Sequence, residues 1–193
     1  MAALAVAVIA STAIAQEGER VRLRGTIDTV NGDTLAMTTG AGEQVTLTLT
    51  DETRISGTAP RSIDDIGPGT FLASAGERRD DGRIYAVEVR IFDREIPARQ
   101  FEYDLGPQSV MTNAPVAEVM SVGEGNVIKV TLEGGEAVEY VIEPDVPIYV
   151  TEPADRSLLV PGAYIVVNGT RLPDGTHVAG SITAERDGLK PAN

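Results

Sequence analysis

Apolar and polar residues alternate over short stretches along most of the chain. Between Arg20 and Ile27, the apolar residues Val21, Leu23 and Ile27 fall on one face, which is the two-residue period of a half-buried β-strand. Asn31-Gly32-Asp33 then provides a hairpin turn. The same alternation predicts strands over residues 34–39, 44–50, 70–76 and 83–92, with Val45, Leu47 and Leu49 inward in the second of these and Tyr85, Val87, Val89 and Ile91 inward in the last.

This pattern occurs twice along the chain, at a spacing of 93 residues. Before Gly32 the register shifts by one residue, so that Ile27 corresponds to Val119 and Val30 to Val122. Turn glycines and inward apolar residues are preserved together, which predicts two copies of one domain rather than a short solenoid repeat. The corresponding positions include Gly32 with Gly125, Leu47 with Tyr140, Pro68-Gly69 with Pro161-Gly162, and Asp81-Gly82 with Asp174-Gly175.

Each copy contains three strands, a short turn of helix capped by Ser62 in the first copy, and two further strands. This is the strand order of an OB-like barrel, and closure protects the edges of a small sheet. We therefore predict an all-β protein of two tandem small OB-like β-barrels, each of five to six strands, over residues 20–92 and 116–186. Residues 93–115 hold several apolar side chains and are predicted to be an ordered linker packed on the barrels, with a mobile tether as the alternative.

The first 14 residues carry no charged side chain, and the apolar run from Leu4 to Ala10 is too short to span a bilayer as a helix. Ala13 and Ala15 are small residues at the spacing that signal peptidase recognises. We predict a signal peptide over residues 1–15, cleavage after Ala15, and a periplasmic or secreted mature chain without a membrane span. A buried first helix is the alternative, because the basic residues that usually open a signal peptide are absent.

Several short motifs resemble those of an exported bacterial family, the domain-of-unknown-function family 5666. They are Gly25-Thr26-Ile27, Asn31-Gly32-Asp33-Thr34-Leu35, Val45-Thr46-Leu47-Thr48, Gly67-Pro68-Gly69 and Asp81-Gly82-Arg83-Ile84-Tyr85-Ala86. The resemblance covers most of the mature chain and implies a small β-barrel outside the cytoplasm. It implies no catalytic residues.

The chain is strongly acidic, with 29 Asp and Glu against 16 Lys and Arg, and a net charge of −13. Such a charge repels the phosphates of nucleic acids and anionic membrane surfaces, and it attracts a basic protein or a cation. Aromatic residues, which stack on nucleic-acid bases, make up only 4% of the chain. The absence of cysteine excludes disulfides, thiolate metal sites and cysteine nucleophiles.

His177 is the single histidine. A Ser-His-Asp arrangement would combine it with Asp174 and with Ser157 or Ser181, but the spacing does not establish that geometry. We interpret His177 as a surface residue beside a turn. Paired carboxylates, which act as acid and base or bind calcium, are interpreted as caps and turns; they occur at Asp51-Glu52, Asp64-Asp65 and Asp80-Asp81.

Arg20, Arg22 and Arg24 form a basic stripe on the outward face of the first strand. The stripe would either bind an anionic group, pair with acids of a neighbouring strand, or protect a strand edge. Asn168-Gly169-Thr170 fits a glycosylation sequence and is interpreted as a turn.

The sequence thus predicts no catalytic, cofactor-binding or metal-binding residues. We predict a non-catalytic binding or scaffold protein of the bacterial envelope, which contacts an envelope protein or small ligand by β-edge pairing or through a cleft. The alternative is a periplasmic stress protein that binds a cation or small ligand through carboxylates. An enzyme would need carboxylates from distant strands to converge in one pocket, and nucleic acid is not an expected partner.

Overall fold

The computed structural model describes residues 18–92, 94–123 and 125–191; the predicted signal peptide, residues 1–15, lies outside them. The described residues form thirteen strands and two 3-10 turns, which confirms the predicted all-β class. In chain order the elements are β1 (Glu19–Asn31), β2 (Thr34–Thr39), β3 (Gln44–Thr48), β4 (Arg54–Arg61), η1 (Ile63–Asp65), β5 (Phe71–Arg78), β6 (Ile84–Phe92), β7 (Arg99–Glu102), β8 (Ser109–Val122), β9 (Gly125–Thr131), β10 (Ala137–Ile142), β11 (Ile148–Pro153), η2 (Arg156–Leu158), β12 (Tyr164–Arg171) and β13 (His177–Ala184).

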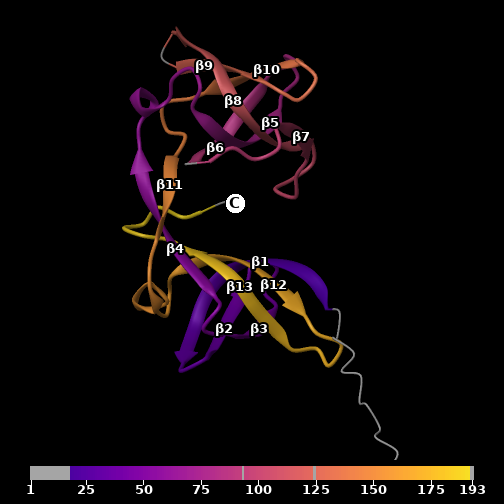
Figure 1. The fold of residues 1–193 in the computed structure, drawn as a ribbon, viewed down its shortest axis with the longest axis vertical. Helices are drawn as coiled ribbons and strands as arrows, with labels where there is room; N and C mark the ends of the chain where they lie inside the picture. Colours follow the sequence, from indigo (N-terminus) through magenta and orange to yellow (C-terminus); the bar gives the residue numbers. More distant parts are fainter. Residues whose placement is uncertain (1–17, 93, 124, 192–193) are drawn as a thin grey trace, which may run out of the picture.

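The strands gather in two lobes, one above the other in Figure 1. In the lower lobe, β3, β2, β1, β12 and β13 pair in that order, and each pair is antiparallel. In the upper lobe, β10, β9, β8, β5 and β6 pair in the same way. A short parallel contact then joins the first and last strand of each series, between β3 and β13 and between β10 and β6.

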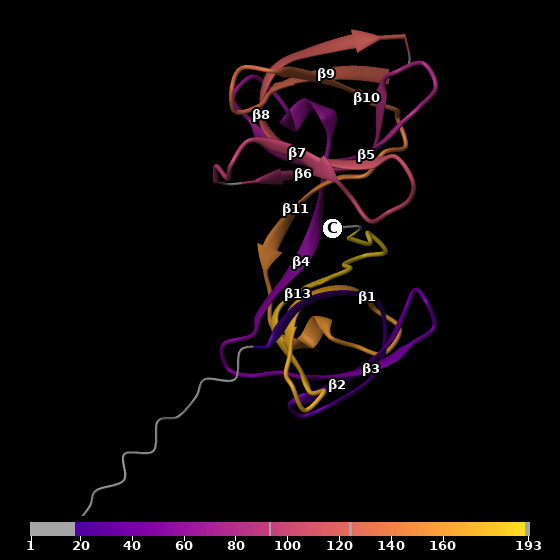
Figure 2. The same cartoon turned by 90° about the vertical axis from the view of Figure 1, so that its right-hand side faces the viewer.

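The strands β4 and β11 run between the lobes as an antiparallel pair (Figure 2). Their register places Thr58 opposite Thr151, and these two residues are 93 positions apart in the chain. β4 also pairs with β13, and β11 with β6, both in parallel. All thirteen strands therefore belong to one continuous sheet with approximate two-fold symmetry about the β4–β11 pair.

Each lobe contains strands from both halves of the chain, which differs from the prediction of one separate barrel for residues 20–92 and another for 116–186. β4 leaves the lower lobe along β11, so β5 and β6 are carried into the upper lobe beside β8 and β10. β12 and β13 take the corresponding places beside β1 and β3 in the lower lobe. The two halves are thus interlocked.

Each lobe has an aliphatic core to which both halves contribute. Burying one large aliphatic side chain contributes about 1.5–3 kcal/mol, so each core stabilises the interlocked arrangement. The lower core includes Ile27, Leu35, Met37 and Leu47 from the first half and Ile165, Val167 and Ile182 from the second; the upper core includes Leu72, Ile84 and Val89 from the first half and Val116, Ile128, Val130 and Tyr140 from the second.

The first hairpin of the second half is longer than its counterpart. Ile27 lies opposite Met37 and Val116 opposite Val130; ten residues separate the first pair and fourteen the second, a difference of four. Met37 and Val130 are 93 residues apart, so Ile27 corresponds to Val116, and the predicted match with Val119 is wrong. The sequence comparison allowed one extra residue in this part of the second half, whereas the strand pairing shows four.

The predicted inward face of β6 is also partly wrong. Val87 is 40% exposed, whereas its neighbour Ala86 is 6% exposed. The β5–β6 register shifts between Ala75 and Gly76, which leaves Val87 in a β-bulge. A bulge adds one residue to a strand and so reverses the alternation beyond it.

The segment predicted as an ordered linker, residues 93–115, contains β7 and the start of β8. β7 pairs with β8, and the first part of β8 pairs with β5. Tyr103 and Leu105, which follow β7, pack against a small third core that includes Met111. This segment is therefore an added layer on the upper lobe.

Candidate functional site

The two lobes differ in what lies beside the first part of β1 in the lower lobe and beside the first part of β8 in the upper lobe. Gly25 of β1 lies opposite Ile165, and Ala114 of β8 lies opposite Leu72. Ile165 and Leu72 are 93 residues apart, so residues 20–24 correspond to residues 109–113. β7 runs along these residues of β8, whereas no strand of the described chain runs along residues 19–24 on the side away from β12.

Burial of the two stretches differs accordingly. All five residues from Ser109 to Asn113 are buried beneath β7 and its neighbours. In β1, Arg20 and Arg22 are exposed, and Val21 and Leu23 are only half-buried. A strand edge with reachable apolar side chains is a template for pairing with another chain. We call the edge of residues 20–24 that faces away from β12 the β1 flank.

One end of the β1 flank is joined to the upper lobe. The Arg24 guanidinium donates hydrogen bonds to both carboxylate oxygens of Asp104, at 2.7 and 2.9 Å, and to the Tyr103 hydroxyl at 2.8 Å. Arg22 and Arg24 also lie over the Tyr103 ring, 5.6 and 5.4 Å from its centre. Burial lowers the pKa of Arg24, but its hydrogen bonds to Asp104 and Tyr103 outweigh burial and raise it. The Arg24 hydrogen bond lowers the pKa of Asp104.

A buried polar pair lies on the crossing strands. The Tyr149 hydroxyl of β11 donates a 2.7 Å hydrogen bond to the Glu88 carboxylate of β6, and both residues are at most 1% exposed. Burial and the adjacent Glu88 raise the pKa of the Tyr149 phenol. Nearby Arg90 donates to the Thr151 hydroxyl at 3.2 Å, and burial lowers the pKa of its guanidinium. The pair ties β6 to the crossing strand and has the character of a structural contact.

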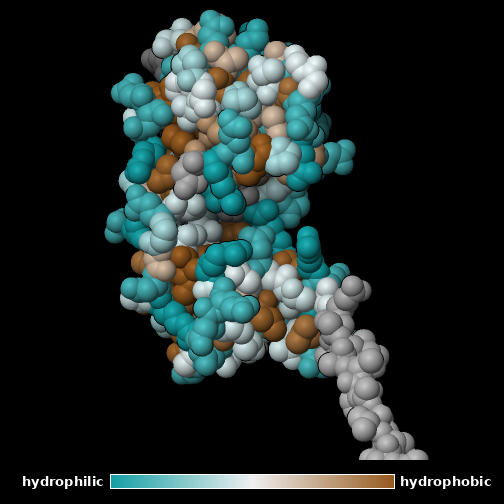
Figure 3. Space-filling model, in the orientation of Figure 1, coloured by the Kyte–Doolittle hydropathy of each residue, from teal (hydrophilic) through white to brown (hydrophobic). Residues whose placement is uncertain are grey.

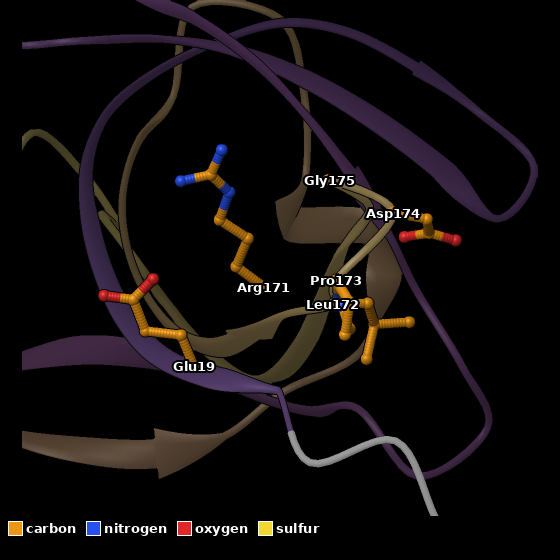
Figure 4. A pocket seen from close by; sticks show the side chains of 6 residues that line it. All are labelled: Glu19, Arg171, Leu172, Pro173, Asp174 and Gly175. Atoms are coloured by element: carbon orange, nitrogen blue, oxygen red, sulfur yellow. The ribbon is translucent and has the colours of Figure 1, made fainter.

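A surface hollow with a volume of about 550 Å³ lies at the end of the lower lobe. Its wall comprises Glu19 of β1 and the β12–β13 turn from Arg171 to Gly175. Figure 4 shows the Asp174 carboxylate turned away from the Arg171 guanidinium, and this carboxylate accepts a hydrogen bond from the Thr176 N–H at 2.9 Å. The Asp174 carboxylate therefore holds its own turn rather than facing Arg171.

Another hollow, of about 310 Å³, lies between the β3–β4 turn and the start of η2. Arg156 on its rim pairs with Asp33 at 2.6 Å, and Asp155 accepts a hydrogen bond from the Ser157 N–H at 2.8 Å. The hydrogen bonds from Ser157 lower the pKa of Asp155. The charged side chains of this hollow therefore stabilise its own loops: Arg156 pairs with the β1–β2 turn, and Asp155 caps η2.

His177 begins β13 beside the turn at Asp174. In the described part of the chain, its side chain makes no hydrogen bond or ion pair with Asp174, Ser157 or Ser181. Ser181 lies opposite Arg54 along the sheet, and Ser157 is in η2. The structure does not bring these residues together as a nucleophile and base.

In two of the three acidic pairs, one carboxylate caps a turn. Asp65 accepts a 2.8 Å hydrogen bond from the Ser62 N–H at the start of η1. Asp81 accepts from the Arg83 N–H at 3.0 Å and from the Tyr85 hydroxyl at 2.8 Å, and these bonds lower its pKa. Asp51 and Glu52 are exposed in the β3–β4 turn.

Two further sequence interpretations have structural outcomes. Of the arginine stripe, Arg24 pairs with Asp104, which comes from the β7–β8 connection rather than from a neighbouring strand. Asn168-Gly169-Thr170 is part of β12, so its interpretation as a turn is wrong. The β12–β13 register shifts between Asn168 and Gly169, so the segment lies at a β-bulge.

Sequence reasoning missed the residues that connect the lobes. Tyr103 and Asp104 lie in a segment without periodicity, and their partner Arg24 is 80 positions away from Asp104. Glu88 is buried within β6, but the predicted alternation placed Val87 and Val89 inward and Glu88 therefore outward. The sequence pattern thus gave no sign of its burial or of its hydrogen bond with Tyr149.

The surface and composition of the described chain add three observations. No group of three or more His, Asp or Glu side chains among the described residues is arranged to hold a metal ion. No helix in residues 18–92, 94–123 or 125–191 is long and apolar enough to cross a membrane. On the face shown in Figure 3, apolar residues lie in small groups among hydrophilic ones.

Comparison with known proteins finds a family whose model matches part of this all-β chain. Residues 24–90, about a third of the chain, match the family described as Domain of unknown function (DUF5666), which supports the resemblance noted in the sequence. The matched region runs from β1 to β6 and so includes strands of both lobes. No curated protein and no solved structure matches the chain significantly.

Proposed function

We propose that this protein is an exported, non-catalytic binding or scaffold protein of the bacterial envelope, which holds another envelope protein by pairing with the β1 flank. The protein consists of two tandem copies of an OB-like barrel domain whose last two strands are exchanged. Residues 1–15 act as the signal peptide. The family resemblance supports export, and the net charge of −13 disfavours nucleic acid as the partner.

The observation that carries the proposal is the difference between the two corresponding strands. β7 covers residues 109–113 of β8, but the described chain supplies no equivalent strand for residues 20–24 of β1. Proteins usually cover, charge or distort an edge of this kind. Addition of a strand from a partner is a common way to use one.

Site-specific photo-crosslinking in cells that produce the protein tests this function. We expect a photoreactive residue in place of Arg20 to capture a discrete envelope protein, and the mature chain to begin at Gln16 by intact mass. The control position is Glu136, an exposed turn residue of the upper lobe. Equal capture at both positions, or no adduct at Arg20, would contradict the proposal.

A further inference from the structure

We propose that the β1 flank accepts an extended segment of the partner in which acidic and apolar residues alternate, as a strand antiparallel to β1. This inference rests on the proposed function and adds the chemistry and register of the partner. The incoming strand takes the position beside β1 that β7 has beside β8.

Backbone direction supports this docking. The Arg24 C=O accepts a hydrogen bond from the Gly40 N–H at 3.2 Å, so the Arg24 backbone faces the flank away from β12. In an antiparallel strand every second residue faces the same side, and Arg20 therefore presents its N–H and C=O to this flank. Arg20 is exposed, which makes these groups accessible to an incoming strand.

The β7–β8 pair defines the register. Phe101 lies opposite Met111, and Glu102 opposite Val110. Met111 and Val110 correspond to Arg22 and Val21 in β1 by the equivalence of Ala114 with Gly25. The partner residues opposite Arg20 and Arg22 therefore alternate with those opposite Val21 and Leu23.

The side chains of β1 select the partner's chemistry. Residues directly opposite each other in an antiparallel pair have neighbouring side chains, and opposite charges there are stabilising. Acidic residues therefore suit the positions opposite Arg20 and Arg22, where the β1 side chains are exposed. Apolar residues suit the positions opposite Val21 and Leu23, which are both half-buried; Leu23 also packs against the lower core.

The acidic charge of the whole chain limits which acidic segments bind. Long-range repulsion from a net charge of −13 is screened beyond roughly 8 Å at physiological ionic strength, whereas contacts with the arginines act at hydrogen-bond distance. Only a segment that aligns its carboxylates with the stripe overcomes the repulsion. The alternation, rather than acidity alone, is therefore the feature recognised.

Binding of defined fluorescent peptides to the purified protein tests the inference. The probe is a peptide in which glutamate and valine alternate; the comparisons are a scrambled peptide of the same composition and a peptide with lysine in place of glutamate. We expect the alternating peptide to bind about tenfold or more tightly than either comparison. Amide hydrogen exchange of residues 20–24 should slow when it binds.

Variants separate the charge from the backbone contribution. The double change Arg20→Glu with Arg22→Glu should weaken binding of the alternating peptide by about tenfold or more, and Arg54→Glu, at an exposed arginine of β4, should not. Arg20→Pro removes the backbone N–H on the flank and should weaken binding more than Arg20→Ala, which retains it.

Three results would overturn the inference: equal binding of the scrambled peptide, preference for the lysine peptide, or exchange protection confined to another strand. Failure of the peptide with continued photo-capture of an envelope protein at Arg20 would reject the partner chemistry and leave the proposed function standing. Peptide binding at the β1 flank without any envelope adduct would reject the proposed function alone. Capture of a second copy of this chain would count against both.

Discussion

The interlocking of the two halves predicts that the chain stays assembled after it is cut between them. Arg94 and Glu95 are exposed and lie between β6 and β7, so a protease recognition sequence inserted there should be cleaved in the native protein. The cut leaves one fragment with β1 to β6 and another with β7 to β13. Each fragment then supplies part of both cores.

The structure indicates how tightly the fragments hold together. The first fragment buries four large side chains in the upper core, and the second fragment buries four in the lower core. Each of these side chains contributes about 1.5–3 kcal/mol. Together they contribute about 12–24 kcal/mol, from which association removes about 4–15 kcal/mol. The midpoints of these two ranges differ by roughly 8 kcal/mol, which corresponds to a Kd near 1 µM, before the backbone hydrogen bonds between fragments are considered. These side chains are Ile66, Leu72, Ile84 and Val89 in the upper core and Leu159, Ile165, Val167 and Ile182 in the lower core.

Size-exclusion chromatography and native mass spectrometry of the cleaved protein measure this directly. At a concentration about tenfold above that Kd, we expect both fragments to elute together as a one-to-one complex with the mass of the uncut chain. They should separate in denaturant, or when diluted well below that Kd. The uncut insertion variant is the control for any effect of the inserted residues. Two independently folded fragments that separate under native conditions would refute the interlocked arrangement.

Three substitutions test individual contacts. Gly25→Ala places a Cβ 2.1 Å from the Thr38 carbonyl oxygen, and this overlap should destabilise the fold by about 1–3 kcal/mol in urea unfolding. Asp104→Asn removes the ion pair with Arg24, which contributes at most about 1 kcal/mol to stability. Because the pKa of Asp104 is lowered in the folded protein, this stabilisation is present above about pH 4 and is lost as the pH falls through the folded pKa. The variant should therefore be less stable than the parent at neutral pH and equally stable in acid. Tyr149→Phe removes a hydrogen bond to a buried carboxylate and should cost about 1–3 kcal/mol.

Matched controls isolate each cause. Gly40→Ala adds a methyl group in open space, Asp51→Asn changes an exposed turn residue, and Tyr164→Phe keeps the ring beneath Lys190. Each control should leave the unfolding midpoint close to that of the parent. If a control lost as much stability as its test variant, the corresponding contact would not be the cause.

The alternation of residues in the sequence was sufficient to locate most strands and their buried sides. Val45, Leu47 and Leu49 are buried as predicted, and η1 lies within the predicted turn at residues 62–66. The pattern did not locate β4, β7 or β11, because they contain prolines, glycine or too few residues for a period to be visible. At Val87 a bulge interrupts the period, and only the pairing with β5 reveals it.

The sequence by itself determined the strand period and most of the turns, and it indicated a recurrence of the pattern, because these follow from each residue and its near neighbours. Only the tertiary structure decided which half supplies the last two strands of each lobe. β5 and β12 are corresponding strands, so β1 would bury the same kinds of side chain against either one, and local patterning is equally compatible with both. The direction of β4 along β11 selects the interlocked pairing, and with it the positions of β7 and the β1 flank, because those depend on contacts between residues far apart in the chain.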